Sequence, residues 1–589
     1  MAVNNINYHT ANVNQTTPAI VAQSAVNRLP RIALLMLCVA YVLPGLLGRG
    51  PWKGADISSF GYMAALARGE TAWFAPQLLG LPPAVDALFP YWWGAWAMVW
   101  APAWIAPDLA VRIAFGLLLA LTLVAVWYGT YYLARSPEAQ PVAFAFGGEA
   151  LPADYARAMA DGGLLAFIAC LGLAQLSHET TPAMAQLTFT ALFAYALAAL
   201  PYRTWAPAIA GIVGLTGLAV SGAPTMAILF GAGSALIYLL DQSPEPIEAK
   251  RQLAWVGAIV ALTVGVAVLS STLNLWRWRI DLPQASWLEW RNLGRLQLWF
   301  TWPAWPLVLW TLWRWRRHLV RGQAPTRHLA LPLWMAIVAL GATFTTDSAD
   351  RSLLLALPAL AALAAFALPT LGRSVSALID WFTLIFFSGC AIVIWVVWIS
   401  MQTGIPRQPA ANVARLAPGF EHSFSLTPFL IAVMATVAWS LLVKWRVGRH
   451  RSAIWKSLVL PAGGAVLSWL LLMTLWLPLL DFARSYAPFV QRAVAVMQPA
   501  DCVETLGLNR GQIAALQFHG QLVIKTASAA ATCNWLMVGK DIDLTASNML
   551  EPNQWLLVTP LRKASRGSEE VKIYRRSDKS ASDWQETPK

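Results

Sequence analysis

The chain has 589 residues, of which 58% are hydrophobic and only 12% are charged, and its formal net charge is +13 at pH 7. Soluble domains carry about 25% charged residues, so this composition excludes an ordinary soluble protein and predicts a polytopic membrane protein. A basic chain also suits nucleic acid, but here the basic residues are divided among loops on two faces of the predicted bundle. We therefore expect membrane lipids, and no nucleic acid, as partners.

Residues 1–30 begin with a polar stretch that has no hydrophobic period, which predicts a disordered cytoplasmic tail. Residues 32–48 form the first apolar run. No A-x-A-like cleavage site follows this run, and further apolar runs come after it. We therefore expect a retained membrane span rather than a cleaved signal peptide.

Apolar runs predict about thirteen transmembrane helices within a membrane domain over residues 31–480. They lie near residues 32–48, 109–134, 162–176, 184–201, 206–221, 223–241, 253–271, 299–313, 329–344, 352–369, 375–400, 427–443 and 457–480. The densest basic clusters, RWRRHLVR (314–321) and KWRVGRHR (444–451), fall in loops on the same side as the N-terminus. The positive-inside rule places that side in the cytoplasm, so an odd number of spans puts the C-terminal segment in the periplasm of a bacterial inner membrane.

The C-terminal segment, residues 481–589, has ordinary polarity. Short apolar stretches such as QLVIKT and WLLVTP alternate with polar turns, which predicts a small soluble α/β or α+β domain. It contains Cys502 and Cys533, whereas the other three cysteines lie in predicted spans. Two cysteines outside the cytosol favour a disulfide, with a pair of buried free thiols as the alternative.

The external loop over residues 49–108 is much longer than a hairpin requires. Its stretch ADISSFGYMAALARG places Ile57, Phe60 and Met63 on one face, which predicts an amphipathic helix lying along the membrane surface. Asp56 stands at the start of this helix, where an aspartate is either an N-cap or a reactive carboxylate. The Trp-rich piece that follows, residues 86–107, predicts an interfacial helix or a bent span.

Three further external segments contain charged residues among apolar ones. QLSHETTPAM contains His178 and Glu179, and TFTTDSADRS contains Arg351. The Trp-rich stretch 274–299 contains three candidate phosphate-binding residues, Arg277, Arg279 and Arg295. Arginine on the outer face opposes the positive-inside trend and holds phosphate by bidentate hydrogen bonds. The alternative is ion pairing with nearby carboxylates or with anionic lipid headgroups.

The order of these features resembles the GT-C membrane glycosyltransferases related to protein O-mannosyltransferases and to the lipid A aminoarabinose transferase. PWKGADISSFGYMAALARGE resembles the family's Asp-bearing loop helix, and FAPQLLGLPP resembles its Pro–Gly step. DRSLLLALPALAALAAFAL resembles its Arg- and Pro-containing span, and DLAVRIAFGLLLALTL places Arg112 at the start of the second span. The sequence departs from the family where Ile57 replaces a Glu, and where Asp86 and Ala87 replace a Glu–Lys pair.

The resemblance implies a mainly α-helical GT-C fold and an inverting sugar transfer from a polyprenyl-phosphate donor to a lipid, glycan or protein acceptor. It implies catalytic roles for Asp56 and Glu179. The donor phosphate would meet Arg351, Lys53, Arg277, Arg279 and Arg295. A divalent metal, if one is used, would have His178 and Asp86 as candidate ligands. The alternative is a non-catalytic or transporting membrane protein that binds polyprenyl-linked glycans.

Overall fold

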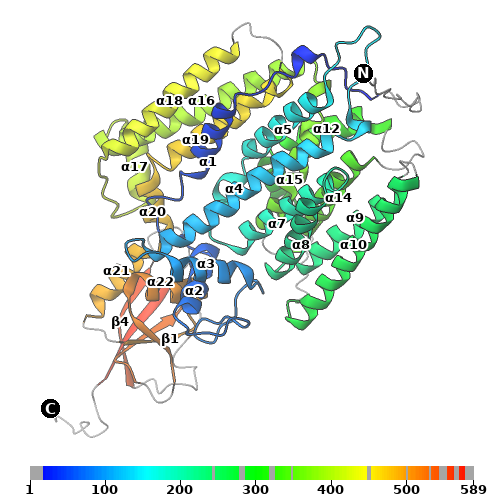
Figure 1. Cartoon of the computed structure of the whole chain (residues 1–589). Helices are drawn as coiled ribbons and strands as arrows, with labels where there is room; N and C mark the ends of the chain where they lie inside the picture. Colours follow the sequence, from blue (N-terminus) through cyan, green and yellow to red (C-terminus); the bar gives the residue numbers. More distant parts are fainter. Residues whose placement is uncertain are drawn as a thin grey trace, which may run out of the picture.

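The computed structural model describes residues 17–241, 246–276, 286–317, 326–346, 349–447, 453–498, 502–528, 532–540, 542, 554–562 and 570–577. The chain is mainly helical, with one mixed sheet near the C-terminus (Figure 1). The helices of the N-terminal half are α1 (Arg31–Val42), α2 (Ala55–Ala67), α3 (Phe89–Trp100), α4 (Pro107–Ala134), α5 (Pro152–Ala169), α6 (Leu173–Leu176), α7 (Pro182–Ala199), α8 (Trp205–Val220), α9 (Pro224–Leu240) and α10 (Pro246–Thr272). The later helices are α11 (Trp287–Phe300), α12 (Ala304–Arg314), α14 (Arg327–Ala342), α15 (Ala349–Ala365), α16 (Arg373–Thr403), α17 (Arg407–Leu416), α18 (Leu426–Val447), α19 (Val459–Leu472), α20 (Leu477–Arg484), α21 (Ala487–Val496) and α22 (Arg510–Gly520).

A helix lies in each of the apolar runs that predicted a span. Within the described residues, seven helical segments are long and apolar enough to cross a membrane; they contain α4, α7, α10, α15, α16, α18 and α19. Four shorter apolar helices, α1, α8, α9 and α14, accompany them. The prediction of a polytopic helical membrane protein is therefore confirmed at the level of the fold.

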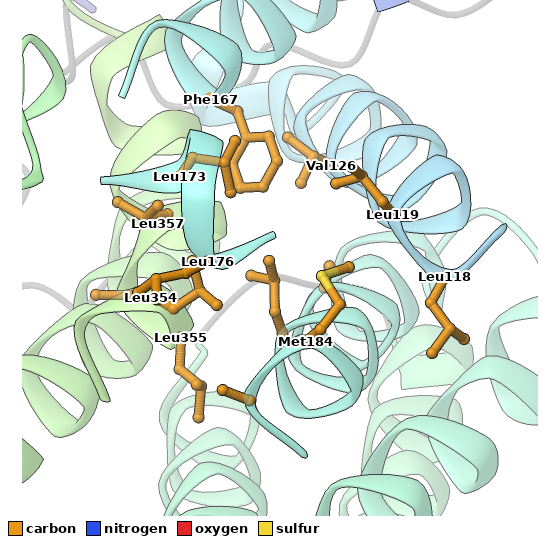
Figure 2. Close-up of a cluster of buried hydrophobic side chains, with 14 of the residues drawn as sticks. Leu118, Leu119, Val126, Phe167, Leu173, Leu176, Met184, Leu354, Leu355 and Leu357 are labelled. Atoms are coloured by element: carbon orange, nitrogen blue, oxygen red, sulfur yellow. The ribbon is translucent and has the colours of Figure 1, made fainter. Parts of the chain in front are cut away.

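The main core of the bundle lies between α4, α5, α7 and α15. Figure 2 shows leucine, valine, phenylalanine and methionine side chains from these helices and from α6 converging on one another. Helices in a bilayer gain little from the hydrophobic effect among themselves, so close packing through small residues stabilises them instead. At Gly163 an added Cβ would lie 2.7 Å from the Thr130 hydroxyl, and at Gly214 it would lie 2.8 Å from the Phe193 backbone nitrogen.

A second core joins the helices at the other edge of the bundle. Phe387 and Ala391 of α16 pack with Trp439 of α18 and Leu471 of α19. The sequence predicted one helix over 457–480, but α19 ends at Leu472 and the chain turns into α20. Helix α20 begins at Leu477, still inside the predicted run, but it is separate from α19 and contacts the loop before α2, which matters for the candidate site.

The C-terminal sheet has the strand order β2-β1-β3-β5-β4. Its strands are β1 (Cys502–Leu506), β2 (Val523–Thr526), β3 (Trp535–Gly539), β4 (Trp555–Arg562) and β5 (Glu570–Arg576). Strand β1 pairs in parallel with β2 and β3, and β5 pairs antiparallel with β3 and β4. Parallel β1 and β2 require a crossover, and α22 supplies it. This arrangement agrees with the predicted mixture of helix and strand.

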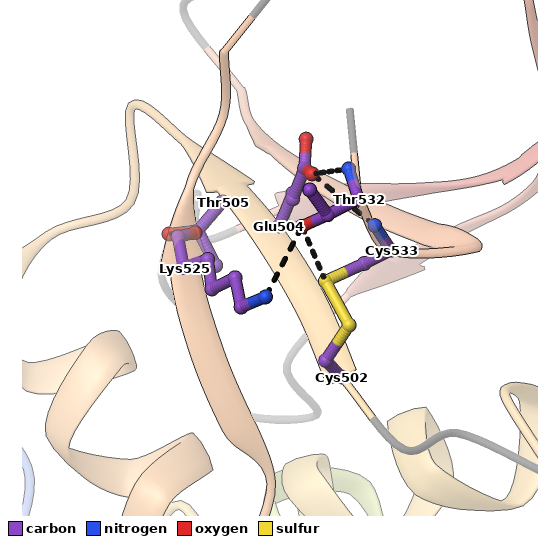
Figure 3. The surroundings of a disulfide bond; sticks show 6 residues. All are labelled: Cys502, Glu504, Thr505, Lys525, Thr532 and Cys533. Carbon is purple, nitrogen blue, oxygen red and sulfur yellow. Dashed lines mark hydrogen bonds between the residues drawn. A yellow bond between two sulfur atoms is a disulfide. The ribbon is translucent and has the colours of Figure 1, made fainter. Parts of the chain in front are cut away.

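The disulfide joins Cys502 at the start of β1 to Cys533 before β3, with the two Cα atoms 5.5 Å apart (Figure 3). The Glu504 carboxylate lies beside it and accepts hydrogen bonds from the backbone nitrogens of Thr532 at 2.7 Å and Cys533 at 3.3 Å. The pairing expected from the sequence is therefore present, and a buried carboxylate fixes the same turn.

Helix α2 is buried on more than the one face that the sequence predicted. Ile57, Phe60 and Met63 are buried as expected, but Tyr62 and Leu66 are buried too. The reason is α22, which packs on α2 so closely that a Cβ at Gly61 would lie 2.6 Å from the Ala514 Cβ. The simple amphipathic interpretation was wrong because hydropathy did not reveal that the C-terminal segment covers this helix.

The expected disordered tail over 1–30 was wrong for residues 17–30. Ala19, Val21 and Val26 are almost fully buried. The Trp455 indole nitrogen donates to the Asn27 carbonyl at 2.8 Å, which holds the segment against the bundle. The small apolar residues of this segment pack against the bundle although their sequence has no helical period. Residues 1–16 lie outside the described residues.

Figure 1 shows the sheet, α2 and α3 at one end of the bundle and the N-terminal segment at the opposite end. Helix α3 has 12 residues, or about 18 Å, and is too short to cross a hydrocarbon layer of about 30 Å. Of the two interpretations of residues 86–107, the short interfacial helix agrees better with this length.

Candidate functional site

Five charged side chains that are distant in sequence meet where the loop after α1 reaches α2. They come from the loop before α2, the start of α2, the loop between α6 and α7, the first turn of α15 and the last turn of α20. They are Arg49, Asp56, Glu179, Arg351 and Arg484. Asp56, Glu179 and Arg351 were predicted to share one external site, and the structure brings all three together.

Asp56 is 2% exposed, and all of its acceptor capacity is in use. Its Oδ2 accepts from Arg49 Nη1 at 3.1 Å and from the Trp52 backbone nitrogen at 2.9 Å. Its Oδ1 accepts from the backbone nitrogen and the hydroxyl of Thr180, both at 2.7 Å. Asp56 therefore joins the loop before α2 to the loop before α7.

The alternative role of Asp56 as a helix N-cap is wrong. The N-cap of α2 is Gly54, whose φ of 87° lies in the left-handed region that favours glycine. None of the donors to Asp56 belongs to the first turn of its own helix. An aspartate in that turn still suits the positive end of the helix dipole.

Arg49 is the buried partner of Asp56, and each of its three guanidinium nitrogens donates a hydrogen bond. Its Nε donates to the Gly45 carbonyl at 2.8 Å, and its Nη2 donates to the His178 carbonyl. The guanidinium also lies 4.6 Å from the ring centroid of Trp52. A buried ion pair is tolerated only when such additional hydrogen bonds satisfy both ions, and here they do.

Glu179 lies next to this pair and is bound more loosely. Its Oε1 accepts from Gln175 Nε2 at 3.1 Å, and its Oε2 lies 3.4 Å from Arg351 Nη2. Burial raises the pKa of the Glu179 carboxyl, and the negative charge of Asp56 raises it further. A buried carboxyl with a raised pKa beside a cation is typical of acid–base sites.

Arg351 is the more accessible cation, with 29% of its side chain exposed. Sequence left open whether it pairs with a neighbouring carboxylate or is available for phosphate. Its ion-pair partner is Glu179, 172 residues away, whereas Asp350 accepts only its backbone nitrogen. Its Nε is buried and has no hydrogen-bond partner among the described residues, so one donor is left over.

Helix α20 completes the cluster. Asp481 Oδ1 accepts from the Gly50 backbone nitrogen at 3.1 Å and from the Trp52 indole nitrogen at 3.0 Å. One turn later, Arg484 lies 5.1 Å from the centroid of the same indole. Burial lowers the pKa of Arg484, while the negative charge of Glu179 opposes that shift.

His178 is not placed to bind a metal. Its Nδ1 lies 2.6 Å from the Ala174 carbonyl, its Nε2 lies 3.0 Å from the Tyr41 carbonyl, and its ring packs on Trp469. Burial lowers its pKa to about 4, so the ring is neutral at pH 7. The described residues contain no group of three or more His, Cys, Asp or Glu side chains that could hold a metal ion.

Asp86, the other candidate ligand, lies elsewhere. Burial is the main reason why the pKa of the Tyr91 phenol is raised, and the nearby Tyr62 and Asp86 raise it further. Asp86 therefore lies in the segment before α3, near Tyr91, rather than in the loop that holds His178. The residues present do not fit a metal site at this cluster.

The remaining predicted phosphate ligands divide into three cases. Lys53 is exposed beside the cluster, and its backbone nitrogen donates to the Arg484 carbonyl at 2.8 Å. Arg295 is exposed on α11 and forms no ion pair in the described part of the chain. Arg277 and Arg279 lie outside the described residues. Arg112 lies near the start of α4, as expected, and is buried there with Asp108 as its ion-pair partner at 2.5 Å.

Arg49 and Arg484 are the residues that the sequence predictions missed. Arg49 directly follows an apolar run on the predicted outer side, which was a usable signal, because such a position opposes the positive-inside trend. Arg484 had no comparable signal. Its role depends on α20 turning back toward Trp52, whose partner Asp481 is 429 residues away in sequence.

No protein-family model and no curated protein matches the sequence. The structure, however, is similar to that of ArnT from Cupriavidus metallidurans bound to undecaprenyl phosphate, with a TM-score of 0.56, 12% sequence identity and coverage of 92% of this chain and 96% of that one. The same protein in the apo state gives a TM-score of 0.51 at 14% identity, with the same coverage. The chain therefore has the fold of the GT-C membrane glycosyltransferases, the family that its sequence motifs resemble.

Proposed function

We propose that the protein is a glycosyltransferase of the bacterial inner membrane. It moves a sugar from a polyprenyl-phosphate donor to a lipid, glycan or protein acceptor on the periplasmic face. The observation that carries this proposal is the meeting of two buried carboxylates with three arginines at one end of the bundle. The shared fold supports it, because one similar structure contains undecaprenyl phosphate.

The reaction needs a base and a cationic site for the leaving group. A carboxylate takes the proton from the acceptor hydroxyl, and the acceptor oxygen bonds to the anomeric carbon as the bond from that carbon to the phosphate oxygen breaks. The electron pair of the broken bond leaves with the polyprenyl phosphate. Arginines next to that phosphate stabilise its developing charge.

Glu179 is better placed than Asp56 to act as the general base. All acceptor positions of Asp56 are occupied by fixed donors, whereas Glu179 has two longer contacts. A raised pKa also makes Glu179 the stronger base once it is ionised. Because the base must be deprotonated, activity should fall on acidification at a higher pH than for an ordinary carboxyl group. Asp56 then holds Arg49 and the loop before α7 in place.

Arg351 suits the donor phosphate. It combines a partly exposed guanidinium, a buried Nε without a partner in the described part of the chain, and a long contact to Glu179 that an incoming phosphate can replace. Arginine can bind a phosphate through two parallel hydrogen bonds.

One observation favours a second candidate function. The complete hydrogen bonding of Asp56 agrees with a membrane protein that binds polyprenyl-linked glycans without transferring them. Such a protein would need the cationic cluster but no base.

The experiment is glycan and lipid mass spectrometry of a deletion strain complemented with wild type, Glu179→Gln or Asp56→Asn. We expect Glu179→Gln to fold normally and to lower product formation by roughly 10²–10⁴-fold. Asp56→Asn leaves Arg49 buried without its counter-charge, which should cost about 3–5 kcal/mol of stability and lower the melting temperature. Glu70→Gln is the control, because Glu70 is exposed and its ion-pair partner is the neighbouring, exposed Arg68.

A Glu179→Gln protein that restores the full modification would show that Glu179 is not the base. If deletion alters no glycan or lipid while the purified protein binds undecaprenyl phosphate, the binding function is favoured over transfer.

A further inference from the structure

We propose that Arg484 of α20 is a second phosphate-binding arginine, held ready against Trp52 by the residues of its own helix. This inference rests on the proposed function and assigns part of the donor site to a helix that follows the last apolar span.

Arg484 differs from the other two arginines of the cluster because its side chain has no acceptor among the residues that the structure describes. The charge of Arg49 is balanced by Asp56 at 3.1 Å, and Arg351 faces Glu179 at 3.4 Å. The Arg484 guanidinium forms no hydrogen bond or ion pair within the described residues, and its contact is with the face of Trp52. It is half-buried, so its charge is partly removed from water. A partly desolvated cation without an anion is favoured by the arrival of one.

The position of Arg484 is fixed by more than its own side chain. Asp481 holds Gly50 and the Trp52 indole, and the Arg484 carbonyl accepts from the Lys53 nitrogen at 2.8 Å. These bonds attach the loop before α2 to α20. The guanidinium groups of Arg49 and Arg484 both lie over the Trp52 ring, at 4.6 Å and 5.1 Å from its centroid. Such an arrangement lowers the entropy that a flexible arginine loses on binding an anion.

The arrangement of charges in the cluster agrees with an anionic ligand. The guanidinium groups of Arg49, Arg351 and Arg484 lie near three carboxyl groups, those of Asp56, Glu179 and Asp481, and burial and the charge of Asp56 raise the pKa of Glu179. Arg484 is close enough to both Glu179 and Arg49 for their charges to shift its pKa. Arg351 and Arg484 both lie near Glu179, and neither has a short contact to a carboxylate within the described residues, so both guanidinium groups can meet a phosphate.

The test compares binding of undecaprenyl phosphate with binding of undecaprenol, the same lipid without phosphate, to purified full-length protein. The variants are Arg484→Gln, Arg484→Lys and the control Arg415→Gln; Arg415 is an exposed arginine of α17 whose side chain donates to Asn412 Oδ1. We expect Arg484→Gln to weaken undecaprenyl phosphate binding about tenfold or more and to leave undecaprenol binding unchanged. Arg484→Lys keeps the positive charge but loses the paired N–H donors of the guanidinium, so its affinity for undecaprenyl phosphate should lie between those of Arg484→Gln and wild type. If Arg484→Gln fails to fold, Arg484→Lys decides the question.

Equal undecaprenyl phosphate affinity of wild type and both Arg484 variants would overturn this inference and leave the proposed function standing. A parallel loss for both lipids would also overturn it, because it would mean that Arg484 is structural. If phosphatidic acid competes as well as undecaprenyl phosphate, the site is a general phospholipid site and the assignment to the donor is wrong. A wild-type protein that binds undecaprenyl phosphate no better than undecaprenol would count against the proposed function itself.

Discussion

At the scale of single residues, the site is built from buried charges that are satisfied by backbone groups. Arg49 reaches the carbonyls of Gly45 and His178, and Asp56 reaches the backbone nitrogens of Trp52 and Thr180. An isolated buried charge would be very costly, so these side chains need their backbone partners. Because the partners belong to loops, each hydrogen bond also fixes a loop. The cluster thus determines the shape of the loops that surround it, and it leaves the more loosely bound Glu179 and Arg351 for the proposed chemistry.

His178 gives a prediction about pH and stability. Its pKa in the folded protein is lowered from the ordinary 6.5 to about 4 because burial disfavours the charged ring, and the nearby Ala174 and Tyr41 carbonyls offset this only in part. The corresponding stability is present above pH 6.5 and is lost as pH falls toward 4, amounting to about 3 kcal/mol at the limit. We expect the melting temperature of wild type to fall more steeply from pH 7.5 to 4.5 than that of His178→Gln. Parallel curves for the two proteins would contradict this.

At the scale of elements, much of the helix pattern was predictable and the packing partners were not. Hydropathy located α4, α7 and α15, because a membrane span has a length and composition of its own. The resemblance placed Asp56, Glu179 and Arg351 in one site, and the structure agrees. Local patterns contain no information about α22 on α2 or α20 on Trp52, since those partners are hundreds of residues away.

The C-terminal sheet offers a test at the same scale. The disulfide closes a loop between residues 31 apart in sequence and anchors β1 to the turn before β3. Cross-links of this size stabilise by about 2–4 kcal/mol. We expect Cys502→Ser and Cys533→Ser to make residues 502–577 sensitive to limited proteolysis, and we expect dithiothreitol to do the same to wild type.

The control for this experiment is Cys390→Ser, which replaces a free thiol in α16. A sheet that resists protease equally with and without the disulfide would show that packing of α22 on α2 already holds it.

At the scale of the whole molecule, the two ends of the bundle carry different structural elements. One end has α2, α3, the sheet and the charged cluster, and the other has the packed segment 17–30 (Figure 1). Helix α4 runs between these ends with 28 residues, or about 42 Å, which exceeds the thickness of the hydrocarbon layer. A site at one end can therefore meet a lipid-linked substrate at one membrane surface only.

The proposed topology assigns that surface to the periplasm, and it is testable with two single cysteines in a protein whose free cysteines are replaced by serine. Glu70→Cys lies in the exposed turn after α2, and Arg135→Cys lies in the exposed turn after α4 at the opposite end. We expect a membrane-impermeant maleimide to label Glu70→Cys in spheroplasts and to label Arg135→Cys only after the membrane is opened, because the basic loops stay inside. The reverse pattern would place the cluster in the cytoplasm. A periplasmic acceptor would then be excluded, even if the residues of the site prove to be correctly assigned.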